Sequence, residues 1–283
     1  MRPFRFGVVA AQAATGKAWA EKVRRIESFG YATLLVPDGL RYTLSPFAAL
    51  AAAAAVTRDL RLGTYVLASD LHHPLRIAKE TGTLDLLSDG RFELGMGAGR
   101  PDAEAEARLL GVPFESGGVR VQRLATAVQQ IRSALDGRQV GPGPVQQPRP
   151  PLMIAASGNR MLALAAREAD IVALGLPPSE TVDRASERIH SLREAAGARF
   201  SELELNLNMM AVAGQVPRYI QTQMGLTADR LERMGSVASL GGSVDEMCAT
   251  LEERRARLGI TYIAVGDELM DALAPVVARL AGR

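Results

Sequence analysis

The sequence has few of the residues that build covalent or metal-bound frameworks. It contains one cysteine, Cys248, and three histidines among 283 residues. A single cysteine excludes an internal disulfide and fits a reducing compartment. No cysteine or histidine spacing typical of a metal site occurs, so we predict no metal centre, and a GxSxG nucleophile motif is also missing. Because Cys248 lies beside Met247 in a predicted helix, we expect it to be a buried structural thiol.

A charge excess of either sign is missing as well. The 33 basic and 31 acidic residues leave a formal net charge of +2, which provides no electrostatic reason to expect a nucleic-acid or anionic-membrane partner. The longest apolar run, 47–56, is too short to span a bilayer. The N-terminal 20 residues resemble a signal peptide only briefly, because Gln12 and Lys17 interrupt the apolar stretch. We therefore expect a cytoplasmic protein that binds a small molecule.

Aromatic residues make up only 5% of the chain, whereas hydrophobic residues make up 47%. A large core built mainly from Ala, Leu and Val is the expected result. Apolar strand patterns alternate with helical ones along the whole chain, and this alternation predicts one (β/α)8 TIM barrel over residues 1–283. The eight predicted strands span 4–10, 33–37, 60–67, 91–94 with its glycine-rich end, 151–156, 170–175, 203–213 and 260–265.

Several helix boundaries carry their own signals. Thr15 is a predicted N-cap, and Ser45 precedes a proline at the first helical position. Ser243 and Glu246 form a predicted capping box for a helix that ends at Gly259. The proline-rich stretch 137–151 could pass for a linker, but strands and helices alternate again after it, so we interpret it as a surface loop. Residues 217–242 are predicted to form short helices and loops.

The stretch 90–99, GRFELGMGAG, is the most distinctive local pattern. Residues 91–94 alternate outward polar and inward apolar side chains, as a strand does. Glycines then follow at positions 95, 97 and 99, which removes the side chains from one face of the strand end. Either a flat or phosphorylated ligand lies directly against this backbone, or the glycines only form a tight barrel corner.

Active sites of such barrels lie at the carboxyl ends of the strands. This rule selects 38–39, 65–69, 72–73, 97–100 and 156–159. In the last segment, small residues end a strand and open a helix, so free backbone N–H groups and the positive end of the helix point to one place. We predict a phosphate site at Ala156, Ser157, Gly158 and Asn159, although an ordinary strand-to-helix turn would have the same composition.

Three side chains at these strand ends could handle protons. Asp38 follows a buried strand and could accept a proton or a hydrogen bond, or simply stabilise a turn. His72 and His73 precede a helix-opening proline and could titrate near neutrality, although histidines in a loop often have no catalytic role. Arg100 could face the pocket or pair with Asp102. With so few reactive groups, we expect a bound cofactor to carry the chemistry.

Several longer motifs resemble a known family, the bacterial luciferase-like flavin and deazaflavin enzymes, and in particular their coenzyme F420-dependent oxidoreductase branch. The resemblance covers essentially the whole chain, and TLDLLSDGRFELGMGAG is its most specific part. The motifs are LLVPDGL (34–40), HHPLRIAKETGTLDLLSDGRFELGMGAG (72–99), GVPFE (111–115), RMLALAAREADIV (160–172) and PVVARLAGR (275–283).

The resemblance implies a luciferase-like barrel that binds F420 or FMN at the strand ends. It assigns the cofactor phosphate to 156–159 and the cofactor-side glycine loop to Gly97, Ala98 and Gly99. It also implies a non-proline cis peptide at Tyr65-Val66, beneath the cofactor ring. Two further roles are implied: Asp38 as a cofactor-binding or proton-handling residue, and His73 as a substrate-side acid.

The resemblance favours an F420-dependent oxidoreductase that transfers a hydride between C5 of the deazaflavin and a small organic substrate. The alternative is an FMN-dependent monooxygenase that uses oxygen and needs a partner reductase. A barrel that binds cofactor without turnover is a second alternative, because F420-using relatives commonly have Asp-His where this chain has Asp38-Gly39. The resemblance also implies a homodimer, and a flavin or F420 reductase could supply reducing equivalents.

Overall fold

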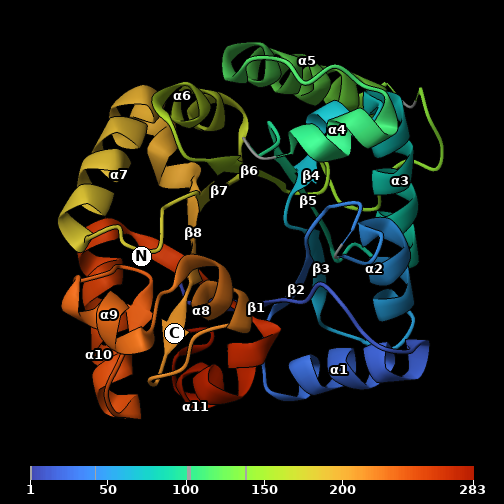
Figure 1. Ribbon diagram of the computed structural model, residues 1–283. Helices are drawn as coiled ribbons and strands as arrows, with labels where there is room; N and C mark the ends of the chain where they lie inside the picture. The colour runs from blue at the N-terminus through green and yellow to red at the C-terminus, as the bar shows by residue number, and fades with distance from the viewer. Residues whose placement is uncertain (1, 42, 101–102, 138) are drawn as a thin grey trace.

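Parallel strands close into a barrel, and helices surround it (Figure 1). The computed structural model describes residues 2–41, 43–100, 103–137 and 139–283. The barrel strands are β1 (Arg5–Val9), β2 (Thr33–Val36), β3 (Arg61–Thr64) with β4 (Leu67–Ala68), β5 (Phe92–Gly97), β6 (Leu152–Ala156), β7 (Ile171–Leu174), β8 (Glu204–Met209) and β11 (Ile260–Gly266). β1 pairs with β11 and β3 pairs with β5, which closes the sheet. The predicted (β/α)8 barrel is confirmed.

The helices form the outer ring of the barrel (Figure 1). They are α1 (Gly16–Ser28), α2 (Pro46–Ala54), α3 (Pro74–Leu87), α4 (Glu104–Leu110), α5 (Gly117–Asp136), α6 (Asn159–Glu168), α7 (Val182–Ala196), α8 (Arg218–Met224), α9 (Ala228–Arg233), α10 (Val244–Leu258) and α11 (Met270–Leu280). Three short 3-10 turns are η1 (Ser69–Leu71), η2 (Gly197–Glu202) and η3 (Asp267–Leu269). α4 and α8 lie in front in Figure 1, over the carboxyl ends of the strands.

Most of the predicted helix signals are confirmed. The Thr15 side chain accepts a hydrogen bond from the backbone N–H of Ala18, and Ser243 and Glu246 form a complete capping box. Ser45 precedes α2, but its side chain makes no capping hydrogen bond, so Pro46 is what defines that helix start. Cys248 is buried in α10, and burial raises the pKa of its thiol.

The third strand of the barrel is interrupted. The sequence predicts one strand over 60–67, but the structure divides it into β3 and β4. The break falls at Tyr65-Val66, whose peptide bond is cis, as the family resemblance implies. Both side chains pack against the cluster that fills the barrel interior, so the interruption brings Tyr65 and Val66 to the level where β5 ends.

The predicted strand over 203–213 is too long. β8 ends at Met209, and β9 (Ala211–Val212) pairs in parallel with β10 (Ser239–Leu240) in a separate small sheet. The backbone N–H groups of Met210 and Ala211 both donate to the carbonyl of Ala238, so the chain leaves the barrel at this point. The apolar run 209–213 continues across the break, which is why the sequence alone does not reveal it.

The apolar core has two layers. A small cluster fills the inside of the barrel and consists of Leu35, Met153, Ile171, Ala173, Tyr262 and Ala264. A much larger cluster lies between the strands and the helices. Because β2, β6 and β7 contribute buried side chains to both layers, their apolar runs are continuous, as expected for parallel strands buried on both faces.

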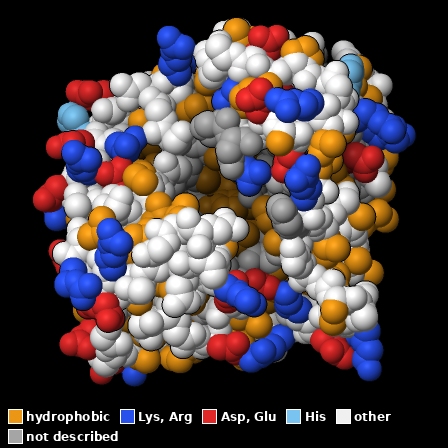
Figure 2. Space-filling model, viewed as in Figure 1, with side chains coloured by type: hydrophobic (Ala, Val, Ile, Leu, Met, Phe, Trp, Pro, Cys, Tyr) orange, Lys and Arg blue, Asp and Glu red, His pale blue; other side chains and the backbone are white. Residues whose placement is uncertain are grey.

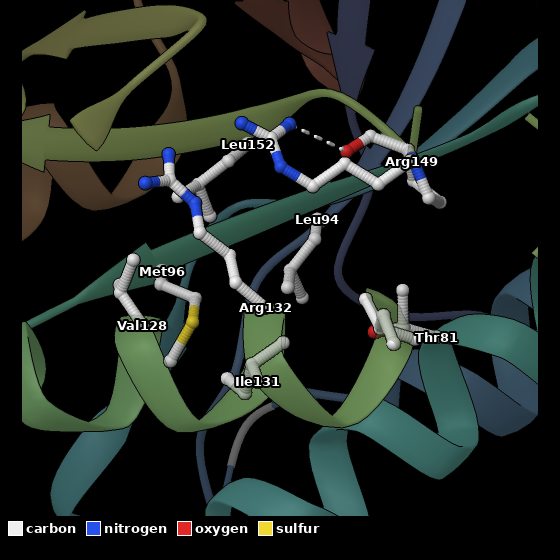
Figure 3. Close-up of a pocket in the computed structure, with 10 residues that line it drawn as sticks. Thr81, Leu94, Met96, Val128, Ile131, Arg132, Arg149 and Leu152 are labelled. Carbon is white, nitrogen blue, oxygen red and sulfur yellow. Dashed lines mark hydrogen bonds between the residues drawn. The ribbon is translucent and has the colours of Figure 1, made fainter. Parts of the chain in front are cut away.

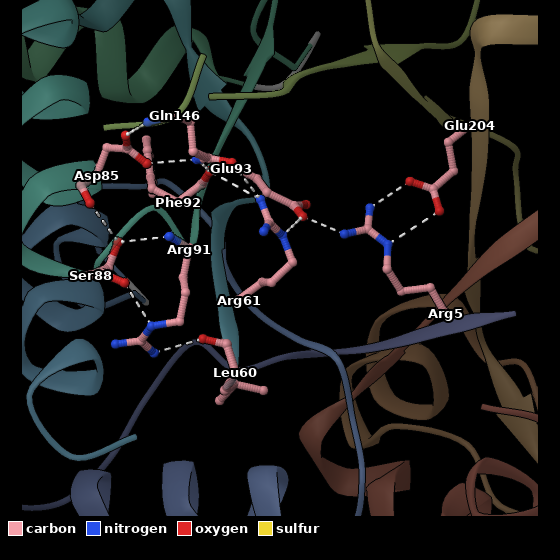
Figure 4. A network of polar contacts seen from close by, with 10 residues as sticks. All are labelled: Arg5, Leu60, Arg61, Asp85, Ser88, Arg91, Phe92, Glu93, Gln146 and Glu204. Carbon is pink, nitrogen blue, oxygen red and sulfur yellow. Dashed lines mark hydrogen bonds and ion pairs between the residues drawn. The ribbon is translucent and has the colours of Figure 1, made fainter. Parts of the chain in front are cut away.

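The opposite end of the barrel is closed by charged side chains (Figure 4). The sequence pattern places Glu93 on an outward polar face, and this expectation is wrong, because the Glu93 side chain is only 2% exposed and faces inward. It pairs with both Arg5 and Arg61, and Arg5 also binds Glu204 with its Nη2 atom 2.6 Å from Oε2. Burial opposes ionisation of Glu93, but the two guanidinium groups hold its pKa below the ordinary value.

The proline-rich stretch 137–151 is packed against the barrel and is not a linker. Asp85, which is fully buried in α3, accepts hydrogen bonds from the backbone N–H groups of Val145 and Gln146 at 2.7 and 2.9 Å. The Gln146 side chain donates to Asp85 and to the carbonyl of Phe92. A buried carboxylate that accepts several N–H groups is a strong anchor. The stretch is a loop, as predicted, but the sequence did not predict that Asp85 holds it against the barrel.

Candidate active site

A cavity of about 320 Å³ opens at the carboxyl ends of β2, β4, β5 and β6. Figure 2 shows the same face hollowed at its centre, with hydrophobic side chains at the bottom of the hollow and charged side chains around it. This volume lies at the small end of the range for ligand pockets. The position agrees with the rule that barrel enzymes place their sites at this end.

The structure gathers most of the predicted site residues around this cavity. The predicted residues that line it are Asp38, Tyr65, Val66, Gly97, Ala98, Gly99, Ala156 and Ser157. Gly158 and Asn159 lie next to it, at the exposed start of α6. His73 lines a separate surface cavity instead, together with His72.

The alternating glycines of β5 face the barrel interior, where neighbouring strands fill the space. A Cβ atom at Gly95 would lie 1.9 Å from the carbonyl oxygen of Thr64, and one at Gly97 would lie 2.8 Å from a methyl group of Val66. The corner interpretation therefore explains Gly95. Gly97 leaves room for the Val66 side chain and also lines the cavity. Gly99 has a positive φ of 76° and lies against the carboxylate of Asp70, so a glycine is needed there as well.

The turn between β6 and α6 has the features of an anion site. Gly158 is the N-cap of α6, and no side chain in the described part of the chain caps this helix start. The first N–H groups of α6 are therefore left for another acceptor, and the positive end of the helix favours an anion. This arrangement suits a phosphate.

Asp38 lines the cavity with a carboxylate and contacts a histidine from another loop. Its carboxylate is 9% exposed and accepts a hydrogen bond from the backbone N–H of Ala68 at 3.1 Å. The same oxygen, Oδ2, lies 2.7 Å from Nε2 of His72. A carboxylate bound to an imidazole in this way can exchange a proton with it.

His73, which the resemblance assigns as a substrate-side acid, is placed elsewhere. Its side chain is exposed, and Nδ1 accepts a hydrogen bond from the backbone N–H of Leu75 at 3.2 Å, which caps α3. His72 is the histidine that reaches Asp38. The HHP sequence alone does not distinguish the two histidines. Only the folded loop shows that His73, at the start of α3, points outward and that His72 points to Asp38.

Tyr65 has a partner that sequence reasoning did not identify. Its hydroxyl donates to Oδ1 of Asn206 at 2.8 Å, and Asn206 is fully buried in β8. Burial raises the pKa of Tyr65, and the neighbouring Tyr219 adds to this effect, so the phenol stays neutral and serves as a donor. The signal that could have revealed the pair is the alternation of Asn206 and Asn208 with leucine, which places two amides on one face of a predicted barrel strand.

The rim of the cavity carries one ion pair. Arg100 Nη2 lies 3.4 Å from Oε1 of Glu106, and both residues line the cavity. The Glu106 side chain is 14% exposed, and a Cβ atom at Gly39 would lie 3.8 Å from its carboxylate. Arg100 therefore faces the pocket, as one of its two predicted roles requires. The other predicted partner, Asp102, lies outside the described residues.

A small void lies between α3, α5, β5 and β6 (Figure 3). Its volume is about 10 Å³, which is room for about one water molecule. Thr81 lines it, and the hydroxyl of Thr81 is buried without a partner in the described structure. The void can therefore hold a water molecule but not a cofactor. Across the described ranges, no cluster of three or more His, Cys, Asp or Glu side chains is arranged to bind a metal.

Comparison with known proteins identifies the family. The sequence profile of the luciferase-like monooxygenases matches residues 3–258. The chain belongs to this family. Its members include oxidoreductases and monooxygenases, and this membership agrees with the barrel, the interrupted third strand and the cavity described above.

A similar curated protein is the oxygenase component of a flavin-dependent trigonelline monooxygenase from Acinetobacter baylyi. It is 30% identical over 123 residues, which are 40% of this chain and 34% of that protein. The matching region thus covers only about a third of that relative. The similarity supports membership of the family. It does not show that this chain acts on the substrate of that relative.

Two solved structures share the whole fold. The F420-dependent tetrahydromethanopterin reductase of Methanopyrus kandleri has a TM-score of 0.76 at 18% identity, covering 98% of this chain and 99% of that one. The monooxygenase RslO1 of Streptomyces bottropensis has a TM-score of 0.73 at 21% identity, covering 98% and 97%. At these identities the similarity establishes the fold alone. In the described part of the chain, no helix combines the length and apolarity needed to cross a bilayer.

Proposed function

We propose that the protein is an F420-dependent oxidoreductase that transfers a hydride between C5 of the deazaflavin and a small organic substrate. The Asp38–His72 pair carries this proposal, because Asp38 lines the cavity and its carboxylate lies 2.7 Å from Nε2 of His72. Reduction of a carbonyl, for example, adds a hydride to carbon and a proton to oxygen. A hydride-transfer enzyme therefore needs a proton-exchanging group beside its substrate.

The residues around the cavity fit a flat, phosphorylated cofactor. Val66, Gly97 and Ala155 line it with small or apolar groups, which suits the face of a ring system. The uncapped start of α6, with Ser157 and Gly158, would hold the phosphate. When bound, F420 supplies or accepts the hydride, and the protein provides the orientation and the proton.

The chain's own residues have distinct parts in this proposal. Asp38 would bind the substrate or exchange its proton, and His72 would hold the carboxylate in place and connect it to the separate surface cavity that His72 also lines. Tyr65, fixed by Asn206, would support the cavity from the barrel interior. Since His73 caps α3, we give the acid role that the resemblance placed on His73 to His72.

An FMN-dependent monooxygenase is the second candidate. It is supported by the similarity to the flavin-dependent trigonelline monooxygenase and by Gly39, since F420-using relatives commonly have a histidine there. Such an enzyme would need a partner reductase and would consume oxygen, whereas F420, which has carbon at position 5, does not support that chemistry. A homodimer and a reductase partner belong to the proposal as well.

Titration of the purified apoprotein with F420 and, separately, with FMN tests the proposal, with cofactor fluorescence as the signal. Selective binding of F420 at micromolar concentrations is the expected result. Selective binding of FMN, with oxygen consumption when reduced FMN is supplied, would replace it with the monooxygenase. Binding of neither would overturn both candidates. Tight binding without turnover across a broad panel of substrates would favour a barrel that binds cofactor without catalysis.

A further inference from the structure

The phosphate turn is held from outside by one arginine. Arg188 lies on α7, and its Nη1 atom donates to the carbonyl oxygen of Ser157 at 2.7 Å. Its Nε atom donates to Oε2 of Glu180 at 2.8 Å. The Glu180 side chain is only 3% exposed, whereas Arg188 is 37% exposed. A buried carboxylate thus fixes the guanidinium that reaches the turn.

The bond to Ser157 determines where the next N–H group points. The peptide between Ser157 and Gly158 is trans, so its C=O and N–H groups point in opposite directions. With the carbonyl directed to Arg188, the N–H of Gly158 must point away from Arg188. The carbonyl of Gly158 is also engaged, because it accepts the N–H of Leu162 in the first turn of α6. Both peptide planes at the N-cap are therefore oriented.

The turn itself has little else to hold it. Ser157, Gly158 and Asn159 are exposed, and a Cβ atom at Gly158 would find no other atom within 4 Å. No side chain in the described residues caps the helix start. A segment with so little packing keeps a defined conformation only through its hydrogen bonds. The bond from Arg188 is the side-chain anchor of this segment.

We propose that Arg188, held by Glu180, is a positioning residue for the cofactor phosphate. It acts through the carbonyl of Ser157 by aligning the N–H donors of the turn before the cofactor binds. This inference rests on the proposed function, because it takes the turn as the phosphate site. It goes beyond that function by giving a role to two residues that lie outside the cavity lining.

Paired ligands with and without a phosphate test the proposal: FMN with riboflavin, which differ only in the phosphate, and F420 with the deazariboflavin that lacks both the phosphate and the tail attached to it. We expect Arg188→Met to raise the Kd of the phosphorylated ligand about tenfold and to leave the Kd of its partner nearly unchanged, since tenfold corresponds to the loss of one charge-assisted hydrogen bond. Arg184→Met is the matched control, because Arg184 is exposed on the same helix and carries the same charge.

Glu180→Gln separates positioning from simple charge. This variant keeps the guanidinium and makes the region more positive, so a purely electrostatic role predicts equal or tighter binding of the phosphorylated ligand. Positioning predicts weaker binding, because a neutral amide holds the Arg188 guanidinium less tightly than the carboxylate does. Arg188→Lys keeps the charge but cannot bind Glu180 and Ser157 with the same fork geometry, so only partial rescue is expected.

The outcomes distinguish this inference from the proposed function. Wild-type protein that binds neither phosphorylated cofactor more tightly than its dephosphorylated partner would overturn both. A wild-type preference for the phosphorylated ligand that persists in Arg188→Met or Glu180→Gln would overturn the inference alone. Thermal unfolding of each variant shows whether it is folded, and a fall in affinity for both ligands of a pair would mean that Arg188 only stabilises the fold.

Discussion

Nε2 of His72 lies 2.7 Å from Oδ2 of Asp38, although the two residues come from loops that follow different barrel strands. The family resemblance implies a histidine directly after Asp38, and this chain has Gly39 at that position. An imidazole nevertheless lies beside the carboxylate, supplied by the loop after β4. We interpret this pair as the proton-handling part of the proposed site.

Replacement of Asp38 by Asn should reduce turnover far more than cofactor binding. The amide keeps the size of the side chain and can still accept the N–H of Ala68, but it cannot take up a proton. The loss of a general acid–base group typically lowers the rate by roughly 10²–10⁴-fold. Steady-state kinetics and cofactor titration on the same variant measure the two effects. Unchanged turnover in Asp38→Asn would remove Asp38 from the proposed mechanism.

The two adjacent histidines provide a matched comparison. His72→Ala should lower turnover, because Asp38 then loses the group that orients it and exchanges protons with it. His73→Ala should leave turnover near the wild-type value and cost about 1 kcal/mol of stability, since it removes a helix cap. Kinetics and thermal unfolding of both variants check this. The opposite pattern would return the acid role to His73.

A carboxylate placed in the phosphate turn should repel the cofactor. Gly158→Asp adds a negative charge at the uncapped start of α6, and we expect at least a tenfold rise in Kd, about 1.4 kcal/mol. Gly158→Ala is the control, because a Cβ atom there meets nothing within 4 Å and the φ of −125° suits any residue. Fluorescence titration gives both values. If Asp and Ala bind equally well, the phosphate lies elsewhere.

Much of the fold could be predicted because barrel strands are buried on both faces. Continuous apolar runs mark the strand before Asp38 and the strand before Ser157. These runs show where each strand lies along the chain and where its carboxyl end falls. The same logic located the turn between β6 and α6 and the end of the barrel at which the cavity opens. It failed beyond Met209, where the apolar run 209–213 continues although the chain has left the barrel.

The partners of the site residues were not accessible from the sequence. Two such pairs are Asp38 with His72, 34 positions apart, and Tyr65 with Asn206, 141 positions apart. A single sequence, read without an alignment, contains no signal for contacts between such distant positions. Glu93 shows a related limit. A charged residue in an alternating strand suggests exposure, yet it is buried here because Arg61 on the neighbouring strand β3 and Arg5 on β1 both pair with it.

Glu93 should make the stability of the protein depend on acid pH. Its folded-state pKa lies below the ordinary value of 4.5, so its contribution to stability is present above about pH 4.5 and is lost as the pH falls through the folded-state pKa. Glu93→Gln should lower stability at pH 7 by about 3 kcal/mol, because Arg5 and Arg61 lose their shared partner. Urea unfolding at pH 7 and below pH 4 measures the difference. A gap between wild type and variant that stays constant with pH would contradict this account.

Gly95 is required by the close approach of the third strand rather than by a ligand. Its N–H donates to Oγ1 of Thr64 at 2.8 Å, and a Cβ atom would lie 1.9 Å from the Thr64 carbonyl oxygen. Because backbone resists displacement, Gly95→Ala should destabilise the protein by about 3 kcal/mol, which corresponds to a fall in Tm of roughly 6–10 °C. Gly117→Ala is the control, since nothing lies within 4 Å of a Cβ atom at the start of α5, and its Tm should stay level or rise. Should Gly95→Ala melt at the wild-type temperature while losing cofactor affinity, the glycine serves the ligand and not the barrel.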